Sequence, residues 1–457
     1  MSRSTVGERA LELAARAVAA AAGDEVDAVA HIESSGFARF AASVVNQPTL
    51  VDDESVTLRV AREGRVGAVS TNRTDGEGLR EAARRAAEAA ANAPRDDAFP
   101  GLPSAAPPPA VEGYDAETAE LDAADQATLA LDAIDGAGDV DLYGYFTSGV
   151  TALGVASSTG LEAAQTMTDA TVLALAAGEG MSGYADATSW RAGDVDPAAV
   201  GREAAEKAER TRNAAELAPG THRALLEPYA FAELLWYFAF TSLSGLALLE
   251  GRSYLSDRVG ERLFDPSLTV VDDALDSRGL PKAFDFEGVP KTRVPLVTDG
   301  VATGVVWDRR TAARAGREST GHALSPPSQR LGPIAFNLAV APGDASLDEL
   351  AERVGDGIYV TRLHYLNIVD ARDGIFTGMT RDGTFRIEGG RVTEPLVNLR
   401  FTTSFPRLLE RLPGIGREQK LVNQSDFYDE RYPFAALVPA VATEAFTTVG
   451  TGSGPGL

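Results

Sequence analysis

Histidine is the residue of this chain best suited to acid–base or metal chemistry, and the chain has only four. They are His31, His222, His322 and His364, and no two are close enough in sequence to bind one ion from a single helix or loop. The chain has no cysteine, which removes thiolate ligands, thiolate nucleophiles and disulfides. The sequence therefore predicts no catalytic residue and no metal ligand here, and we expect a structural role for each histidine.

His364 is the histidine whose neighbours could bind a ligand. It lies in an expected strand, residues 357–369, with Asn367 on the same strand and Asp370 directly after it. An imidazole, an amide and a carboxylate on one strand could orient a peptide through hydrogen bonds. A strand histidine hydrogen-bonded to its neighbours is the alternative, and we favour that structural interpretation. His364, Asn367 and Asp370 are therefore candidate substrate-binding residues, with that alternative open.

Several acidic residues could also do chemistry. Glu233 lies inside the apolar stretch 229–249, where it could be a base or a carboxylate with a raised pKa. We expect it instead to face a polar rim or to pair with an arginine. The paired acids at 52–53 and 272–273 could bind a metal or cleave a glycosidic bond. Because such pairs arise by chance in an acidic chain and turns favour aspartate, we expect neither pair to be functional.

A hairpin and a short helix are the clearest local elements. Residues 292–298 and 301–307 are expected strands, and Asp299-Gly300 between them suits a two-residue turn with positive φ. Asp308 can cap a following helix that ends at Gly316.

The overall charge limits the partners. The formal net charge is −24 over 457 residues, and only four of the 42 basic residues are lysine. With no basic stripe to release counterions, we expect no nucleic-acid partner. An acidic, lysine-poor chain suits a salt-rich cytoplasm, where the Debye length is roughly 3 Å at 1 M salt, and therefore a halophilic source.

The apolar stretch 229–249 is long enough to test for a membrane span. Glu233 interrupts it, as do Thr241, Ser242 and Ser244, and no basic cluster flanks it. The first residues predict an amphipathic helix with Glu8 and Glu12, unlike a secretion signal. We expect a buried core helix, no membrane contact and a cytoplasmic protein.

Pattern and composition divide the chain into three domains and predict an α+β fold. Two N-terminal α/β domains of order helix–strands–helix, 1–93 and 114–218, flank a proline-rich linker at 94–113. Within them, 26–33, 37–45 and 140–146 are expected strands, and 116–134 and 197–217 are expected helices. A mostly antiparallel β domain with a few helices follows at 219–457.

Motifs along the chain resemble those of the TldD/PmbA family of metallopeptidases. They are Asp285-Phe286-Glu287-Gly288-Val289-Pro290, the turn 317–322, the strand 357–370 and the segments 374–378 and 387–392. The strand resembles that of the PmbA branch, also called TldE. This resemblance implies an intracellular peptidase assembly in which the TldD subunit carries H-E-x-x-x-H, with two zinc-binding histidines, a general-base glutamate and a cysteine near the C-terminus.

This chain departs from that metal motif. In the register that the resemblance suggests, Trp236 and Thr241 replace the histidines and Tyr237 replaces the glutamate. We therefore expect a non-catalytic subunit that binds no cofactor itself, pairs with a TldD-type zinc peptidase subunit and helps to bind a peptide substrate. The alternatives are a stand-alone homodimeric peptide-binding scaffold without hydrolytic activity and an enzyme with an unrecognised site.

Overall fold

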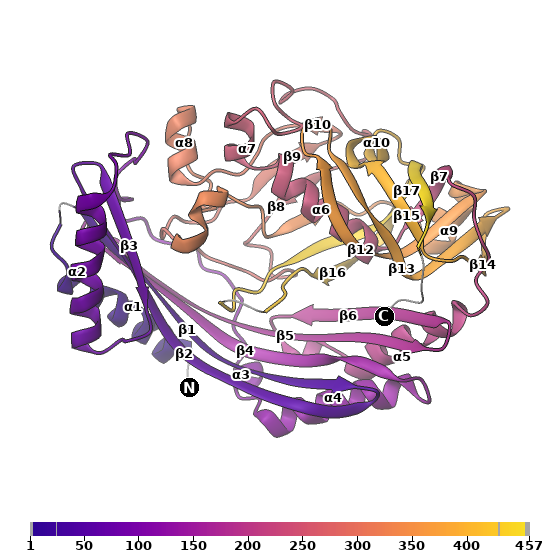
Figure 1. Ribbon diagram of the computed structural model, residues 1–457, viewed down its shortest axis with the longest axis horizontal. Helices are drawn as coiled ribbons and strands as arrows, with labels where there is room; N and C mark the ends of the chain where they lie inside the picture. Colours follow the sequence, from indigo (N-terminus) through magenta and orange to yellow (C-terminus); the bar gives the residue numbers. More distant parts are fainter. Residues whose placement is uncertain (1–2, 24, 428–429, 453–457) are drawn as a thin grey trace.

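The computed structural model describes residues 3–23, 25–427 and 430–452. It has an α+β fold, which confirms the predicted fold class. The elements form two sheets, one from each half of the chain, and the C-terminal half lies over the concave side of the first sheet (Figure 1).

The first sheet is antiparallel, with the strand order β3-β2-β1-β4-β5-β6. Its strands are β1 (Glu25–Ala41), β2 (Val44–Arg62), β3 (Arg65–Thr71), β4 (Leu142–Ser157), β5 (Glu162–Gly178) and β6 (Met181–Ser189). Because β1 pairs with β4 from Asp27↔Ser157 to Phe40↔Gly144, the N-terminal and middle segments share one sheet.

Helices from the same half cover the convex face of this sheet (Figure 1). They are α1 (Arg3–Ala20), α2 (Gly76–Asn92), α3 (Ala116–Ala119), α4 (Ala123–Ala137) and α5 (Pro197–Arg210), with a 3-10 turn, η1, at Ala192–Asp194. Their buried faces are rich in alanine, as in α2, where Ala82, Ala83, Ala86 and Ala90 are buried. Small side chains let each helix lie close to the strands, which favours one well-packed layer.

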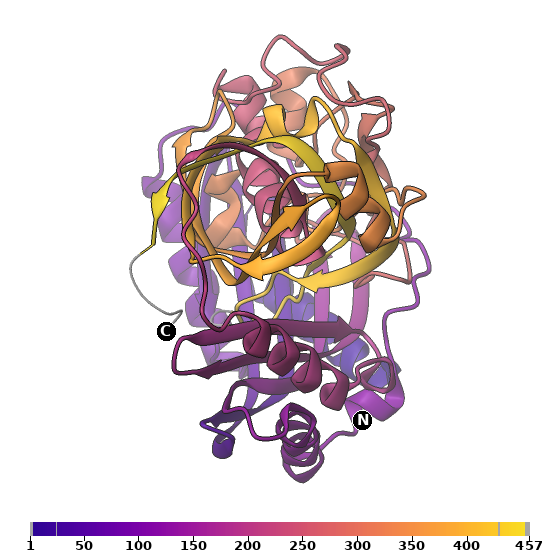
Figure 2. The ribbon, with the colours of Figure 1, turned by 90° about the vertical axis from the view of Figure 1, so that its right-hand side faces the viewer.

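The second sheet has the order β10-β9-β8-β11-β17-β15-β13-β12-β7, with β14 on β13 and β16 on β17. β7 also pairs with β17, and Figure 2 shows the sheet curling round. Its strands are β7 (Gly220–Leu226), β8 (Val270–Asp272), β9 (Val294–Thr298), β10 (Val301–Ala302), β11 (Leu338–Val340), β12 (Gly357–Asp370), β13 (Ile375–Glu388), β14 (Arg391–Pro395), β15 (Leu399–Ser404), β16 (Gly414–Asn423) and β17 (Ala435–Thr451).

The helices of this half are short, apart from α6 with 15 residues. They are α6 (Pro228–Ser242), α7 (Gly245–Leu249), α8 (Arg309–Ala315), α9 (Leu347–Val354) and α10 (Phe405–Leu409), with a 3-10 turn, η2, at Pro326–Leu331. The apolar stretch predicted as a core helix is α6 followed by α7, and α6 is buried against the second sheet. Within the described part of the chain, no helix is both long and apolar enough to cross a membrane.

Local turn and cap predictions are confirmed where the sequence carries a specific signal. Asp299 has φ 48° and Gly300 has φ 76°, as a two-residue hairpin turn between β9 and β10 requires. Asp308 accepts a hydrogen bond from Thr311 N, and Gly316 ends α8 in the left-handed conformation.

Several predicted boundaries are wrong. The expected strand 26–33 and residues 37–41 of the second form one strand, β1, which runs through Gly36, where a Cβ would lie 2.1 Å from Gln126 Oε1. Ala42 and Ser43 make the turn, with φ 48° and 58°, and Val44 begins β2. The expected strand at 140–146 is part of the longer β4. The expected helix 116–134 is two helices, since Asp122 starts a new capping box. The expected helix 197–217 ends at Arg210, and the strand 301–307 ends at Ala302.

Candidate functional site at α6 and the edge of β12

The central helix of the C-terminal half, α6, carries Trp236, Tyr237 and Thr241. In the register that the family resemblance suggests, these residues occupy the positions of the metal motif. The Trp236 ring lies 5.6 Å from the Phe336 ring in a stacked arrangement and 5.0 Å from the Phe434 ring. Such ring contacts hold Trp236 in a cluster that is half-buried.

Tyr237 and Thr241 also make hydrogen bonds and ring contacts within the protein. Tyr237 Oη donates to Leu366 O at 3.0 Å, and its ring lies 6.0 Å from that of Phe376. Thr241 Oγ1 donates to Tyr237 O at 2.9 Å, within the helix itself. Tyr237 therefore connects α6 to β12.

The residues of α6 do not fit a zinc ion. Zinc in proteins is bound by imidazole, thiolate or carboxylate groups, whereas these three positions offer an indole, a phenol and a hydroxyl. Across residues 3–23, 25–427 and 430–452, no group of three or more histidine, aspartate or glutamate side chains is placed to hold a metal ion.

Glu233, one turn before Tyr237, is the one carboxylic acid of α6. Burial raises the pKa of Glu233 to about 7, and the positive charge of Arg362 opposes the rise. Arg362 on β12 lies over the Tyr184 ring at 3.7 Å and donates to Asp382 Oδ2 at 2.7 Å. Arg362 therefore joins β12 to Tyr184 on β6 of the first sheet, and its positive charge acts on the Glu233 carboxyl group.

β12 has an edge without a strand partner. It pairs with β13 along one side, but with β7 only at Ile358, Tyr359 and Val360 on the other. From Thr361 onward that second edge has no strand partner among the described residues, and α6 lies beside it through the Tyr237–Leu366 bond.

A bulge in β12 turns an aromatic side chain into solvent. The pairing with β13 is interrupted between His364 and Asn367, and Tyr365 has φ 57° with 75% of its surface exposed. Bulges of this kind re-aim side chains, and a positive φ in a bulky residue is strained. Ile368 and Val369 beyond it are also exposed, so an apolar ridge follows the bulge. The sequence carries no signal for this bulge, so Tyr365 was not predicted as a site residue.

The predicted residues His364, Asn367 and Asp370 lie along this ridge but do not converge. Asn367 Nδ2 donates to Tyr365 O at 3.0 Å, and Asp370 Oδ1 accepts from Arg372 N at 2.9 Å. The half-buried His364 ring has no hydrogen-bond partner in the described part of the chain, and its ring nitrogens can therefore accept a ligand. Burial, then the charges of Arg381 and Arg362, lowers the pKa of His364, which favours the neutral ring.

The other three histidines are bonded inside the protein. His31 Nε2 lies 3.0 Å from Arg431 O, and His222 Nε2 lies 3.1 Å from Thr448 Oγ1. His322 is fully buried and bonds Asp272 Oδ1 through Nε2 at 2.9 Å. These bonds explain the three residues as structural.

The motif segment that contains Asp285 and His322 is a buried scaffold. Asp285 Oδ1 accepts from Glu287 N at 2.9 Å and from Val289 N at 3.0 Å, and Oδ2 accepts from Ala323 N at 2.8 Å. One carboxylate thus holds the two ends of the motif together. Burial, with the Glu287 charge, raises the pKa of Asp285 to about 7.

Neither paired-acid segment forms a metal site. Asp272 is buried against His322, whereas Asp273 pairs with Arg293 at 3.2 Å. Asp52 and Asp53 are exposed on β2 and do not lie in a turn.

Family models match the three segments of the chain in order. The match to the PmbA/TldA metallopeptidase C-terminal domain covers residues 219–450, about half of the chain. Domain 1 of the same family matches 26–90, and its central domain matches 107–212. The chain belongs to the PmbA/TldD metallopeptidase family. The predicted family is confirmed, and the PmbA (TldE) branch is consistent with these matches.

Curated relatives of this PmbA/TldD chain are metalloproteases by name. A metalloprotease of Methanothermobacter thermautotrophicus is 30% identical over 227 residues, 49% of this chain and 48% of the relative. Metalloprotease PmbA of Escherichia coli O157:H7 is 23% identical over 180 residues, 39% of this chain and 37% of the relative. The chain thus spans about half the length of the curated relatives it matches, or less.

The solved structure of TldE from Thermococcus kodakarensis has the same fold. The two superpose with a TM-score of 0.84 at 20% identity, over 98% of this chain and 99% of the other. At this identity the likeness shows the fold of the PmbA/TldD chain and not its activity.

Proposed function

We propose that this chain is the non-catalytic, PmbA/TldE-like subunit of a TldD–TldE-type metallopeptidase complex that acts in intracellular peptide proteolysis. The observation that carries the proposal is the chemistry of α6. Trp236, Tyr237 and Thr241 pack against aromatic rings and backbone where a zinc subunit of the family would present its ligands. The zinc ion and its activated water would therefore come from a TldD-type partner.

The role of this chain would be to bind the peptide. Beyond Leu366, whose carbonyl accepts from Tyr237, the edge of β12 has no strand partner among the described residues and would offer backbone groups to an extended chain by β-augmentation. The His364 ring can bond a peptide group, while Tyr365 and Ile368 offer apolar contact. Because α6 lies beside this edge, the arrangement supports a peptide held where a catalytic relative would have its metal helix.

The composition supports the setting of this assembly. A net charge of −24 without cysteine suits a salt-rich cytoplasm and disfavours nucleic acid. A location in a salt-rich cytoplasm and the lack of a nucleic-acid partner are therefore part of the proposal.

The first experiment measures zinc and activity on the pure chain. We expect less than stoichiometric zinc and no hydrolysis of unfolded peptides by the chain alone. Hydrolysis should appear on mixing with a chain from the same organism that carries H-E-x-x-x-H. Tight stoichiometric zinc together with peptidase activity from this chain alone would show that it is the catalyst.

The oligomeric state distinguishes the proposed complex with a zinc-bearing subunit from the homodimeric scaffold. Native co-purification should return a relative that carries H-E-x-x-x-H. Recovery of this chain only, as a dimer that retains peptides uncleaved, would instead establish the homodimeric scaffold. The exposed apolar ridge of Tyr365, Ile368 and Val369 supports the homodimer, because such a surface can be buried against a second copy of the chain.

The peptide-binding role of β12 is tested by His364→Ala in the reconstituted complex. We expect kcat/KM for peptides to fall several-fold with thermal stability little changed, because the ring makes no hydrogen bond to the described residues. His222→Ala is the matched control, since His222 is also a half-buried strand histidine but bonds Thr448. Equal kcat/KM in wild type and His364→Ala would remove His364 from the site.

A further inference from the structure

A second free strand edge lies in the N-terminal half, on β5. β5 pairs with β4 along residues 162–176, but its pairing with β6 begins only at Ala170. Residues 162–165 therefore have a strand partner on one side only, among the described residues. Exposed edges of this kind are templates for another strand.

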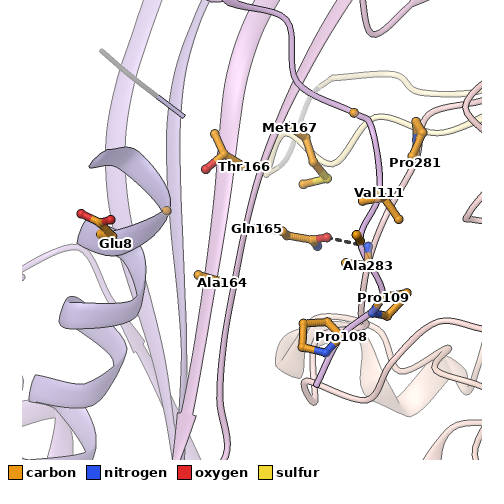
Figure 3. Close-up of a pocket in the computed structure, with 13 residues that line it drawn as sticks. Glu8, Pro108, Pro109, Val111, Ala164, Gln165, Thr166, Met167, Pro281 and Ala283 are labelled. Atoms are coloured by element: carbon orange, nitrogen blue, oxygen red, sulfur yellow. Dashed lines mark hydrogen bonds between the residues drawn. The ribbon is translucent and has the colours of Figure 1, made fainter. Parts of the chain in front are cut away.

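A cavity of about 540 Å³ lies along this edge. Figure 3 shows α1 with Glu8 on one side of β5 and the linker with Pro108 and Pro109 on the other. Pro281 and Ala283 complete the wall on the linker side. The cavity thus has the position that an added strand would take, between the helix layer and the C-terminal half.

The backbone at this edge points into the cavity. Thr168 N donates to Gly113 O at 2.9 Å on the side away from β4. Because backbone groups alternate along a strand, the N–H and C=O of Ala164, four residues earlier, face the same side. Ala164 lines the cavity, so these groups can bond a peptide there.

Gln165 adds an unpartnered donor. Only 7% of this residue is exposed, and its Oε1 accepts from Ala283 N at 2.8 Å across the gap that Figure 3 shows. Its Nε2 has no hydrogen-bond partner in the described part of the chain. A buried amide N–H without a partner is costly, so a ligand with a carbonyl oxygen at this point gains affinity.

The remaining lining selects the kind of ligand. It is apolar, with Pro108, Pro109, Met167 and Pro281, and its one charged residue is Glu8, exposed at the rim. A neutral interior disfavours charged side chains. The Glu8 carboxylate favours an ammonium or a basic side chain at that end by charge complementarity.

We propose that the β5 edge cavity binds a short extended peptide segment of small apolar residues, with its backbone added to β5 and its N-terminal ammonium or a basic residue at Glu8. This is a peptide site separate from the β12 edge and independent of the proposed function. It would let the chain hold a stretch of peptide at a second place, away from the β12 edge.

Methyl NMR of methionine tests this site directly, because the three internal methionines occupy separate places. Met167 lines the β5 edge cavity, Met181 lies on β6, and Met379 pairs with His364 across β12 and β13. The probe is the amidated pentapeptide Arg-Ala-Val-Ala-Val, titrated into the full chain labelled with ¹³C-methyl methionine.

We expect a saturable shift of the Met167 signal with Met181 unmoved. A Met379 shift without a Met167 shift would overturn the β5 site while supporting the β12 edge. An unmoved Met379 with a shifting Met167 would support the β5 site and argue against the β12 edge. No shift of Met167 at millimolar probe would also overturn the β5 site.

Two variants with matched controls locate the binding. Ala110→Trp fills the cavity from an exposed linker position and should weaken binding at least tenfold, whereas Ala105→Trp, exposed on the same linker outside the cavity, should not. Ala164→Pro removes the outward N–H, which proline at a free edge tolerates, and should also abolish the shift. Unchanged affinity in Ala110→Trp and Ala164→Pro, with circular dichroism as in wild type, would refute the proposal.

Glu8 is tested through the charge of the probe. Glu8→Gln should weaken binding of the pentapeptide several-fold at low salt and leave an acetylated probe with alanine in place of arginine unaffected. Equal weakening of both probes would contradict the predicted orientation of the peptide.

Discussion

Arg431 forms a two-point ion pair with Asp169, through Nε–Oδ1 at 2.8 Å and Nη2–Oδ2 at 2.6 Å. Both side chains are 1% exposed. Asp169 lies on β5, and Arg431 lies just before β17, so the pair joins the first sheet to the C-terminal half. Burial raises the pKa of Asp169 although the Arg431 charge opposes the rise.

Asp169→Ala should destabilise the protein by about 3–5 kcal/mol, because it leaves a buried guanidinium without its counter-charge. The measurement is urea unfolding followed by fluorescence. The control is the double variant Asp169→Ala/Arg431→Met, which should recover much of the loss since no charge remains buried. If the double variant loses as much as the sum of both single variants, the two residues are not coupled.

The raised pKa of Glu233 predicts that the free energy of unfolding depends on pH. Its pKa is raised by burial from 4.5 to about 7, so the folded state holds the proton more tightly than the unfolded state. The stabilisation that Glu233 gives to the folded state is therefore complete below about pH 4.5. It is lost as the pH rises to about 7, and above that the free energy of unfolding no longer changes through this residue. Glu233→Gln should gain stability relative to wild type across that window, measured by urea midpoints from pH 4.5 to 8. Glu12→Gln, an exposed acid on α1, is the control and should show no such trend.

Gly300→Ala should cost more than Gly389→Ala, although both glycines have positive φ in hairpin turns. Alanine at 389 meets nothing within 4 Å and costs about 1–2 kcal/mol of backbone strain. Alanine at 300 would also place its Cβ 2.3 Å from Phe264 O, which adds about 1–3 kcal/mol. Thermal melts of both variants make the comparison, and equal losses would mean that the β9–β10 turn shifts to relieve the contact.

The net charge of −24 predicts that salt stabilises the fold. Raising KCl from 0.1 to 2 M screens the repulsion between acidic residues, so the unfolding midpoint should rise. A variant with several exposed acids changed to their amides, Asp52→Asn and Asp53→Asn among them, should show a smaller rise. A midpoint independent of salt, or identical salt responses in both proteins, would argue against a halophilic adaptation.

Local signals in the sequence predicted the elements they directly control. Asp299-Gly300 specifies its turn because few dipeptides adopt positive φ at both positions, and Asp308 specifies a helix start because its side chain bonds the first turn. The break expected between residues 33 and 37 was wrong, because β1 continues through Gly36, where the lack of a side chain makes room for Gln126. That contact depends on a residue ninety positions away in the sequence.

Part of the candidate site, too, could be predicted from the sequence, and part could not. The absence of histidine between His222 and His322 and of cysteine anywhere is a property of the sequence and predicts a chain without the family's zinc ligands. The free ring of His364 and the outward Tyr365 could not be predicted, because a bulge depends on how β12 and β13 are paired.

The sequence by itself determined the family, the α+β class and the loss of the metal motif, because these depend on which residues are present and in what order. Only the tertiary structure decided that two N-terminal segments share one sheet, that Asp169 meets Arg431, and that parts of β5 and β12 lack a second strand partner among the described residues. Strand pairing and ion pairs are set by contacts between residues far apart in the chain, and the free energy of those contacts depends on geometry that composition and local pattern do not contain.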